Sequence, residues 1–387
     1  MPMAPLTRWD PLGTGGKLDL TVVSSDLEAR FPDVGALSAA LDSVGYLAGD
    51  QLAAALFLAV RMAQPILLEG EPGVGKTEAA KALAGALETP LVRLQCYEGI
   101  AASEALYEWN YPRQLLAIRL AEASGEHIQD KDLFTEEYLL SRPLLAALLH
   151  PGPRPAVLLI DEVDRADDEF EAFLFELLAE AAVTIPELGT QHAIIPPVTV
   201  LTSNRTRDLH DALKRRCLYH WIAYPDPLRV AEIIRRRVPA AGDLLAGQVA
   251  AAVSRLRGFD LTKPPGISEA ISWASAVSVL GAGELSADVV GQTMSTVLKY
   301  PEDDEAVRQA GIAAVIDLPG HRPRAARCGV AGGGAGDGVA CGGAAGRARS
   351  LRAACPGCHG HGCPYDRAVA RLRAGYAGVR PRTGANV

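Results

Sequence analysis

The stretch Gly70-Glu71-Pro72-Gly73-Val74-Gly75-Lys76-Thr77 has the residue types and spacing needed to hold phosphate. A glycine, four residues and a Gly-Lys-Ser/Thr triplet make the phosphate-binding loop pattern. The glycines let backbone N–H groups turn inward around phosphate oxygens, and the N-terminus of the following helix adds a favourable dipole. Lys76 is predicted to reach the outer phosphates of ATP, and the Thr77 hydroxyl is predicted to ligate Mg²⁺.

A second candidate site is the acidic pair that follows the apolar run at 156–160. Asp161 at the tip of this run is predicted to hold Mg²⁺, mostly through water. Glu162 is predicted to orient and polarise the water that attacks the γ-phosphate. The simpler interpretation, a surface acidic pair, does not explain why two acids directly follow five apolar residues. The two motifs together predict an ATP-hydrolysing protein.

These motifs require strands and helices in a definite order. An apolar run at 65–68 precedes the loop and a helical pattern follows it, so a chance Gly-rich turn is the weaker explanation. Helical patterns alternate with candidate strands along the first two thirds of the chain, which predicts an α/β fold with a five-stranded parallel sheet and helices on both faces. The candidate strands are 65–68, 91–95, 156–160, 198–202 and 218–222.

Two further regions are predicted around this sheet. Residues 183–185 and 193–195 flank a turn-forming sequence and predict a β-hairpin just before the strand at 198. After residue 222 the pattern is helical only, and Asp226-Pro227 is a helix-start signal. A small all-α lid domain is therefore expected, with helices at 228–237, 242–257, 267–280 and 285–299.

Composition changes sharply near residue 311. Residues 312–387 contain 11 Arg and 3 Asp but no Lys or Glu, which gives this segment a charge of +8. Since the whole chain has a net charge of −8, the first 311 residues have a net charge of −16. We divide the chain into an N-terminal extension (1–35), a nucleotide-binding domain (36–225), a helical lid (226–310) and a tail (311–387). The tail is rich in Gly, Ala, Arg and Cys and is predicted to be disordered. Its composition also suggests translation outside an ancestral reading frame, or read-through past a lost stop codon.

The bulk properties restrict the possible partners. An acidic body argues against non-specific nucleic-acid binding. The longest apolar stretch, 52–60, is too short to cross a bilayer, so no membrane association is expected. The start of the chain lacks a secretory pattern, and Cys96 and Cys217 stand alone in the body. A cytoplasmic protein is the resulting expectation.

The chain resembles the MoxR-type AAA+ ATPases, and within them the CoxD branch, named for maturation of carbon monoxide dehydrogenase. The resemblance covers about residues 40–310 and implies a P-loop AAA+ sheet followed by a helical lid. The two nucleotide motifs are typical of AAA+ enzymes in general. The matching segments are 70–77, 94–99, 105–111, 159–165, 201–217 and 263–266.

The resemblance implies roles for residues beyond the two motifs. Asn204 follows the strand at 198–202, where the family places an amide that senses the γ-phosphate; the alternative is an Asn that only caps a turn. Arg216 aligns with the arginine finger that enters a neighbouring subunit's site. Arg215 competes for that role, and both belong to a basic stretch that could simply be a solvated face. Gln95 is expected to couple Glu162 to client binding.

Three further implications concern the base pocket, the lid and the hairpin. Tyr46 and Leu47 either line an adenine pocket or are ordinary core residues. Glu269 stands where relatives have a lid arginine that meets the γ-phosphate, so either the lid has no such sensor or Arg255 or Arg257 replaces it. The hairpin corresponds to a family insertion that faces the central pore of a ring.

The implied partners are other copies of the chain and a protein client. The resemblance implies a ring, most simply a hexamer, that remodels a molybdenum hydroxylase with a von Willebrand factor A-domain adaptor. An activator of another metalloenzyme, a nucleotide-dependent DNA-binding module and an inactive chain are the alternatives. In the tail, the Cys and His residues of 355–363 suit zinc, c-type haem or half of a DnaJ-type zinc motif. The possible reading-frame change weakens each of these.

Overall fold

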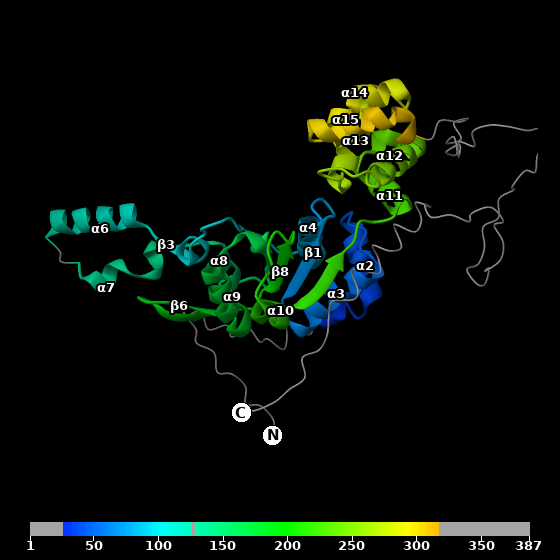
Figure 1. Ribbon diagram of the computed structural model, residues 1–387. Helices are drawn as coiled ribbons and strands as arrows, with labels where there is room; N and C mark the ends of the chain where they lie inside the picture. The colour runs from blue at the N-terminus through cyan, green and yellow to red at the C-terminus, as the bar shows by residue number, and fades with distance from the viewer. Residues whose placement is uncertain (1–25, 126–127, 317–387) are drawn as a thin grey trace, which may run out of the picture. The chain divides into compact units, whose positions relative to one another are not determined.

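A computed structural model of the protein describes residues 26–125 and 128–316 (Figure 1). All of these residues belong to one compact unit. The Cys- and His-containing stretch 355–363 and most of the predicted N-terminal extension lie outside the described residues, so the tail hypotheses stay predictions.

A five-stranded parallel sheet carries the nucleotide motifs, as predicted. Its strand order is β2-β5-β8-β1-β9, so the chain crosses between non-adjacent strands. All five predicted strands are present, with bounds that differ from the expected ones by at most two residues. The strands are β1 (Ile66–Gly70), β2 (Leu91–Gln95), β5 (Val157–Asp161), β8 (Val198–Ser203) and β9 (Leu218–Ile222).

Helices cover both faces of this sheet. Successive side chains on a strand point to opposite faces, and β1 shows the result: Ile66 and Leu68 pack in one hydrophobic cluster, while Leu67 packs in the other. All five residues of β1 are buried, which explains the apolar run Ile66-Leu67-Leu68; Glu69 is buried as well. The first cluster includes α2 (Val34–Ser43), α3 (Asp50–Met62) and α4 (Lys76–Leu87); the second includes α8 (Pro143–Leu148), α9 (Asp168–Glu180) and α10 (Asp211–Arg216).

An insertion separates β2 from β5. It carries a two-stranded antiparallel sheet, and Trp109 of this sheet packs edge-on against Phe134, which follows α7, with ring centroids 5.1 Å apart. Its helix α6 begins at an Asn110 side chain that accepts from the Arg113 N–H. The insertion comprises α5 (Ala102–Leu106), β3 (Tyr107–Trp109), α6 (Tyr111–Ser124), α7 (Asp130–Leu133), η1 (Glu136–Tyr138) and β4 (Leu139–Ser141).

The hairpin before β8 is present, but the prediction of its second strand was wrong. β6 (Ala182–Ile185) pairs with β7 (Gly189–His192), not with residues 193–195. The chain reverses over three residues because Gly189 adopts φ 76° and the Leu188 N–H bonds to the Ile185 carbonyl at 3.1 Å. The apolar residues that suggested a strand instead enter the core, where Ile195 is buried.

Helices follow β9, as the sequence predicts. They form a separate hydrophobic cluster in which the fully buried Trp273 donates from Nε1 to Thr293 Oγ1 at 2.7 Å. Val315 and Ile316 also pack in this cluster, five and six residues beyond the expected end of the lid at residue 310. The elements are α11 (Pro227–Arg237), η3 (Pro239–Ala241), α12 (Gly242–Leu256), α13 (Ile267–Val279), α14 (Ala287–Val297), α15 (Pro301–Ala310) and η4 (Ile312–Ala314). The division into nucleotide-binding domain and lid stays a prediction.

Candidate ATP site

The phosphate-binding loop lies between β1 and α4. Gly73 and Gly75 have φ values of 79° and 97°, which L side chains rarely adopt. At Gly70, a Cβ atom would come within 2.5 Å of the Ile222 carbonyl oxygen, so only glycine fits between β1 and β9. Glycine is therefore required at these three positions for conformation or space.

Lys76 is the first residue of α4 and is buried. Its Nζ donates to the carbonyl oxygens of Gly70 at 2.7 Å and Glu71 at 2.9 Å. Burial lowers the pKa of the Lys76 ammonium, and the carboxylates of Asp164 and Asp161 oppose this effect. Phosphate oxygens are charged acceptors and bind an ammonium more strongly than these carbonyls do. The loop therefore holds the Lys76 ammonium at a position where a bound phosphate can replace these carbonyl oxygens as its hydrogen-bond acceptor.

The acidic pair meets the loop at the carboxyl end of β5. The Thr77 hydroxyl lies 3.0 Å from Asp161 Oδ1, as expected for two oxygen ligands of one ion. Thr202 of β8 fixes both acids: its Oγ1 donates to Asp161 Oδ1 at 2.6 Å and accepts from the Glu162 N–H at 2.9 Å. Glu162 itself has a left-handed backbone, with φ 55°. This turn directs its side chain away from the strand direction.

Two amides contact the Glu162 carboxylate. Gln95 Nε2 donates to Oε2 at 3.1 Å, and Asn204 Nδ2 lies 3.4 Å from Oε1. Arg165 lies 3.2 Å from the same Oε2. The structure thus brings Gln95, Glu162 and Asn204 together from β2, β5 and β8. Their roles in catalysis stay predictions.

Sequence reasoning missed two charged residues of this site. Asp164 is buried and accepts from the N–H groups of Asn204 and Thr206, at 3.2 and 2.8 Å, so it fixes the loop that carries Asn204. Arg93 donates from Nε and Nη2 to Asp161 Oδ2, at 3.0 and 2.6 Å. Arg93 could have been found from its position, two residues before Gln95 and hence on the same strand face.

The two candidate arginine fingers are exposed at the end of α10. The Arg216 guanidinium donates to the Ala212 carbonyl oxygen at 3.2 Å and lies over the Phe175 ring, 5.2 Å from its centroid. Arg215 has no acidic partner among the described residues. Among the described residues, neither arginine side chain contacts the phosphate-binding loop of its own chain. Which of them serves a neighbouring subunit stays a prediction.

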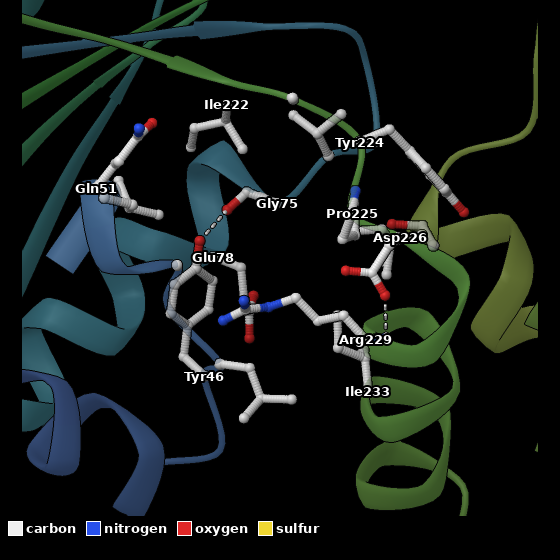
Figure 2. A pocket seen from close by; sticks show the side chains of 18 of the residues that line it. Tyr46, Gln51, Gly75, Glu78, Ile222, Tyr224, Pro225, Asp226, Arg229 and Ile233 are labelled. Atoms are coloured by element: carbon white, nitrogen blue, oxygen red, sulfur yellow. Dashed lines mark hydrogen bonds between the residues drawn. The ribbon is translucent and has the colours of Figure 1, made fainter. Parts of the chain in front are cut away.

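A pocket of about 670 Å³ adjoins the loop, and Tyr46 and Leu47 line it with Gly73 and Gly75. Its volume is in the range of small-molecule sites. The Tyr46 hydroxyl lies 3.5 Å from the Gly75 carbonyl oxygen, and Arg229 reaches from α11 towards Tyr46 and Glu78 (Figure 2). Burial raises the pKa of the Tyr46 hydroxyl, so Tyr46 stays a neutral, apolar wall. This arrangement favours the adenine-pocket interpretation.

The helical region touches the loop at two places. The Ile267 N–H donates to the Gly73 carbonyl oxygen at 2.9 Å, and Glu269 caps its own helix by accepting from the Gly266 N–H at 3.0 Å. Arg257 forms an ion pair with Glu71 and lies over the Tyr224 ring at 4.0 Å, whereas Arg255 donates to the Val315 carbonyl oxygen. Of the two arginines that could replace the lid sensor, only Arg257 reaches the phosphate-binding loop.

Known proteins match part of the chain. Residues 65–217 match the AAA domain of the dynein-related subfamily. The solved structure of the Thermotoga maritima RuvB Holliday junction branch migration motor is 20% identical, with a TM-score of 0.37. That match covers 62% of this chain and 66% of the RuvB chain, just under two thirds of its length. A putative ATPase from Cytophaga hutchinsonii is 16% identical, with a TM-score of 0.38, over 77% of this chain and 97% of that one. No curated protein matches.

The family match and the site geometry agree. The matched segment contains the phosphate-binding loop, both acids and Asn204, together with four strands of the sheet, and β9 follows directly after it. The five strands together have the P-loop AAA+ arrangement. The TM-scores below 0.5 add nothing to this conclusion. None of the helices in 26–125 and 128–316 is long and apolar enough to cross a membrane. Residues 65–217 therefore have the sequence signature and the fold of an AAA domain, which supports hydrolysis of ATP.

Proposed function

We propose that this ATPase uses Mg²⁺, works as a ring, and remodels a protein client. The observation that carries the proposal is the convergence of Thr77, Asp161 and Glu162 beside the phosphate-binding loop. The Thr77 hydroxyl and the Asp161 carboxylate are hard oxygen donors, which suit Mg²⁺. When bound, the ion would neutralise charge that develops on the phosphates.

The chain's own residues would divide the remaining work. Lys76 binds the outer phosphates, and the glycine loop excludes side chains from their path. Glu162 orients the attacking water and accepts its hydrogen bond, while Asn204 holds that water or the γ-phosphate from the adjacent strand. The arginine of a neighbouring copy, Arg216 or Arg215, supplies a further positive charge in the transition state.

We further propose a MoxR-type chaperone of the CoxD branch. Its client would be a molybdenum hydroxylase of the carbon monoxide or xanthine dehydrogenase type, with a von Willebrand factor A-domain adaptor. The sequence resemblance supports this proposal, as does the β6–β7 hairpin placed between α9 and β8. Hydrolysis of ATP, assisted by Glu162, would move that hairpin against the client.

Turnover by three variants tests the ATPase chemistry. Glu162→Gln is expected to bind ATP but lower turnover by at least about a hundredfold, because a neutral amide cannot act on the water as the carboxylate does. Lys76→Ala is expected to lose ATP binding. Glu169→Gln, an exposed acid on α9, is the matched control and should turn over like the unaltered protein. Equal turnover in Glu162→Gln and Glu169→Gln would contradict the role given to Glu162.

Partner capture tests the client. Glu162→Gln with ATP should hold the assembled, client-bound state, and Lys76→Ala is the matched negative sample. Recovery of molybdenum hydroxylase subunits with a von Willebrand A-domain protein, identified by mass spectrometry, would support the maturation role. Recovery of another metalloenzyme instead would mean that the client is a different protein, while the proposed chaperone mechanism stays the same. Equal recovery from both variants would contradict ATP-dependent engagement.

A further inference from the structure

Arg93 connects the two acids of the ATP site through a continuous set of contacts. It lies on β2, where Gln95 is the register partner of Asp161 on β5. Its guanidinium donates twice to Asp161 Oδ2, at 3.0 and 2.6 Å, and also bonds to the Gln95 amide oxygen. Residues two apart on a strand share a face, so Arg93 and Gln95 point to the same place.

The Asp161 carboxylate already has partners on both oxygens. Thr202 and Thr77 contact Oδ1, at 2.6 and 3.0 Å, and Arg93 contacts Oδ2. The Asp161 side chain is 3% exposed, whereas that of Arg93 is 48% exposed. Arg93 can therefore leave towards solvent, while Asp161 cannot. A divalent ion beside Asp161 would repel the guanidinium, because two cations would then face one carboxylate.

The Gln95 amide transmits the position of Arg93 to Glu162. An amide group has one acceptor side and one donor side. With its oxygen turned to Arg93, its Nε2 is turned to Glu162 and donates at 3.1 Å. This bond occupies one oxygen of the carboxylate that is proposed to act on water. Removing Arg93 from Asp161 removes the contact that fixes the amide in this orientation.

We propose that Arg93 is a positioning residue that couples metal binding at Asp161 to the release of Glu162. Without metal, Arg93 neutralises Asp161 and keeps the Gln95 amide on Glu162. With Mg²⁺ and nucleotide bound, Arg93 leaves Asp161, and the Gln95–Glu162 bond loses its support. This inference rests on the proposed use of Mg²⁺. It predicts that Arg93 competes with the metal, so its removal should make the metal bind more tightly.

The test measures binding of a fluorescent ADP analogue to the full chain as Mg²⁺ is titrated. Arg93→Ala is expected to lower the Mg²⁺ concentration for half-maximal effect by at least about fivefold, with affinity for the metal-free analogue unchanged. Arg93→Lys keeps the charge but cannot hold Asp161 and Gln95 in the same forked geometry, so an intermediate shift is expected. Arg113→Ala, which removes an exposed ion pair with Glu137, is the matched control and should not shift the curve.

The outcomes separate the possible roles. A lower melting temperature for Arg93→Ala with an unchanged Mg²⁺ titration would overturn the proposal and leave a purely structural ion pair. Weaker Mg²⁺ dependence in Arg93→Ala would also overturn it, since it would mean that Arg93 assists the metal. If nucleotide binding by the unaltered protein ignores Mg²⁺, the proposed metal chemistry itself fails. If such a protein still hydrolyses ATP, the proposed metal chemistry is wrong while the ATPase activity stands.

Discussion

At the residue scale, buried hydrogen bonds decide where the reactive groups point. Thr202 is 1% exposed. Its hydroxyl donates a hydrogen bond to the Asp161 carboxylate and accepts one from the Glu162 N–H. Buried polar groups need such partners, because leaving one unpaired costs about 1–3 kcal/mol. One hydroxyl thereby fixes both the Asp161 carboxylate and the left-handed turn that presents the second acid.

Asp164 allows a prediction at the same scale. In Asp164→Ala the N–H groups of Asn204 and Thr206 lose their acceptor, so the free energy of unfolding should fall by about 2–4 kcal/mol. ATP turnover should fall as well, because Asn204 is no longer held beside Glu162. Denaturant unfolding and a turnover assay measure the two effects.

Asp167→Ala is the matched control for this prediction. Asp167 also accepts a backbone N–H, that of Phe170 at 2.9 Å, but it is the exposed cap of α9. Its removal should cost about 1 kcal/mol and leave turnover unchanged. Equal losses of stability and turnover in the two variants would contradict a special role for Asp164.

At the scale of elements, one arginine of the helical region forms an ion pair with the nucleotide loop. Arg257 follows α12, lies over Tyr224, bonds to the Pro265 carbonyl oxygen and pairs with Glu71 of the loop. Burial raises the pKa of Tyr224 to about 12, with the Arg257 charge opposing the rise, so the tyrosine under the guanidinium is neutral at physiological pH. Glu71 is a carboxylate partner that a γ-phosphate could replace.

Arg257→Gln is therefore expected to weaken ATP binding more than ADP binding, by roughly tenfold, because only ATP offers a third phosphate to the guanidinium. The two dissociation constants should be measured in the Glu162→Gln background, where ATP persists. Arg255→Gln is the control, since Arg255 bonds to Val315 in the helical cluster. An equal loss for ATP and ADP in Arg257→Gln would indicate a structural contact only.

At the scale of the whole molecule, the proposed site needs a second copy of the chain. Lys76→Ala and Arg216→Ala should each abolish turnover alone, because one removes phosphate binding and the other the charge given to a neighbour. Mixed in equal amounts, they should regain activity at roughly a quarter of the interfaces, where an intact loop meets an intact arginine. A turnover assay on the mixture measures this recovery.

The same mixture with Arg215→Ala decides between the two arginines. Recovery with Arg216→Ala but not with Arg215→Ala would assign the finger to Arg216, as the family alignment implies. If neither mixture exceeds the sum of its separate components, the cross-subunit role is contradicted. The contact of Arg216 with the Phe175 ring is then sufficient to explain its position.

The sequence by itself determined the sheet and the nucleotide motifs. Buried strands are continuous apolar runs, and the glycine loop has a fixed spacing, so both are local signals. This is why all five strands were found and why Lys76, Thr77, Asp161 and Glu162 could be named. The second hairpin strand was misplaced because apolar residues 193–195 look like a strand, although they follow it and pack against the hydrophobic core.

Only the tertiary structure decided which side chains meet across strands. Arg93 and Asp164 are far from their partners in sequence. The alternation along β2 puts Arg93 on the same face as Gln95, but only the strand order puts Asp161 beside it, and no local signal pairs Asp164 with the Asn204 backbone. The choice of Arg257 over Arg255 likewise depends on how α12 packs. Side-chain contacts between elements follow from strand order and packing, which local periodicity does not encode.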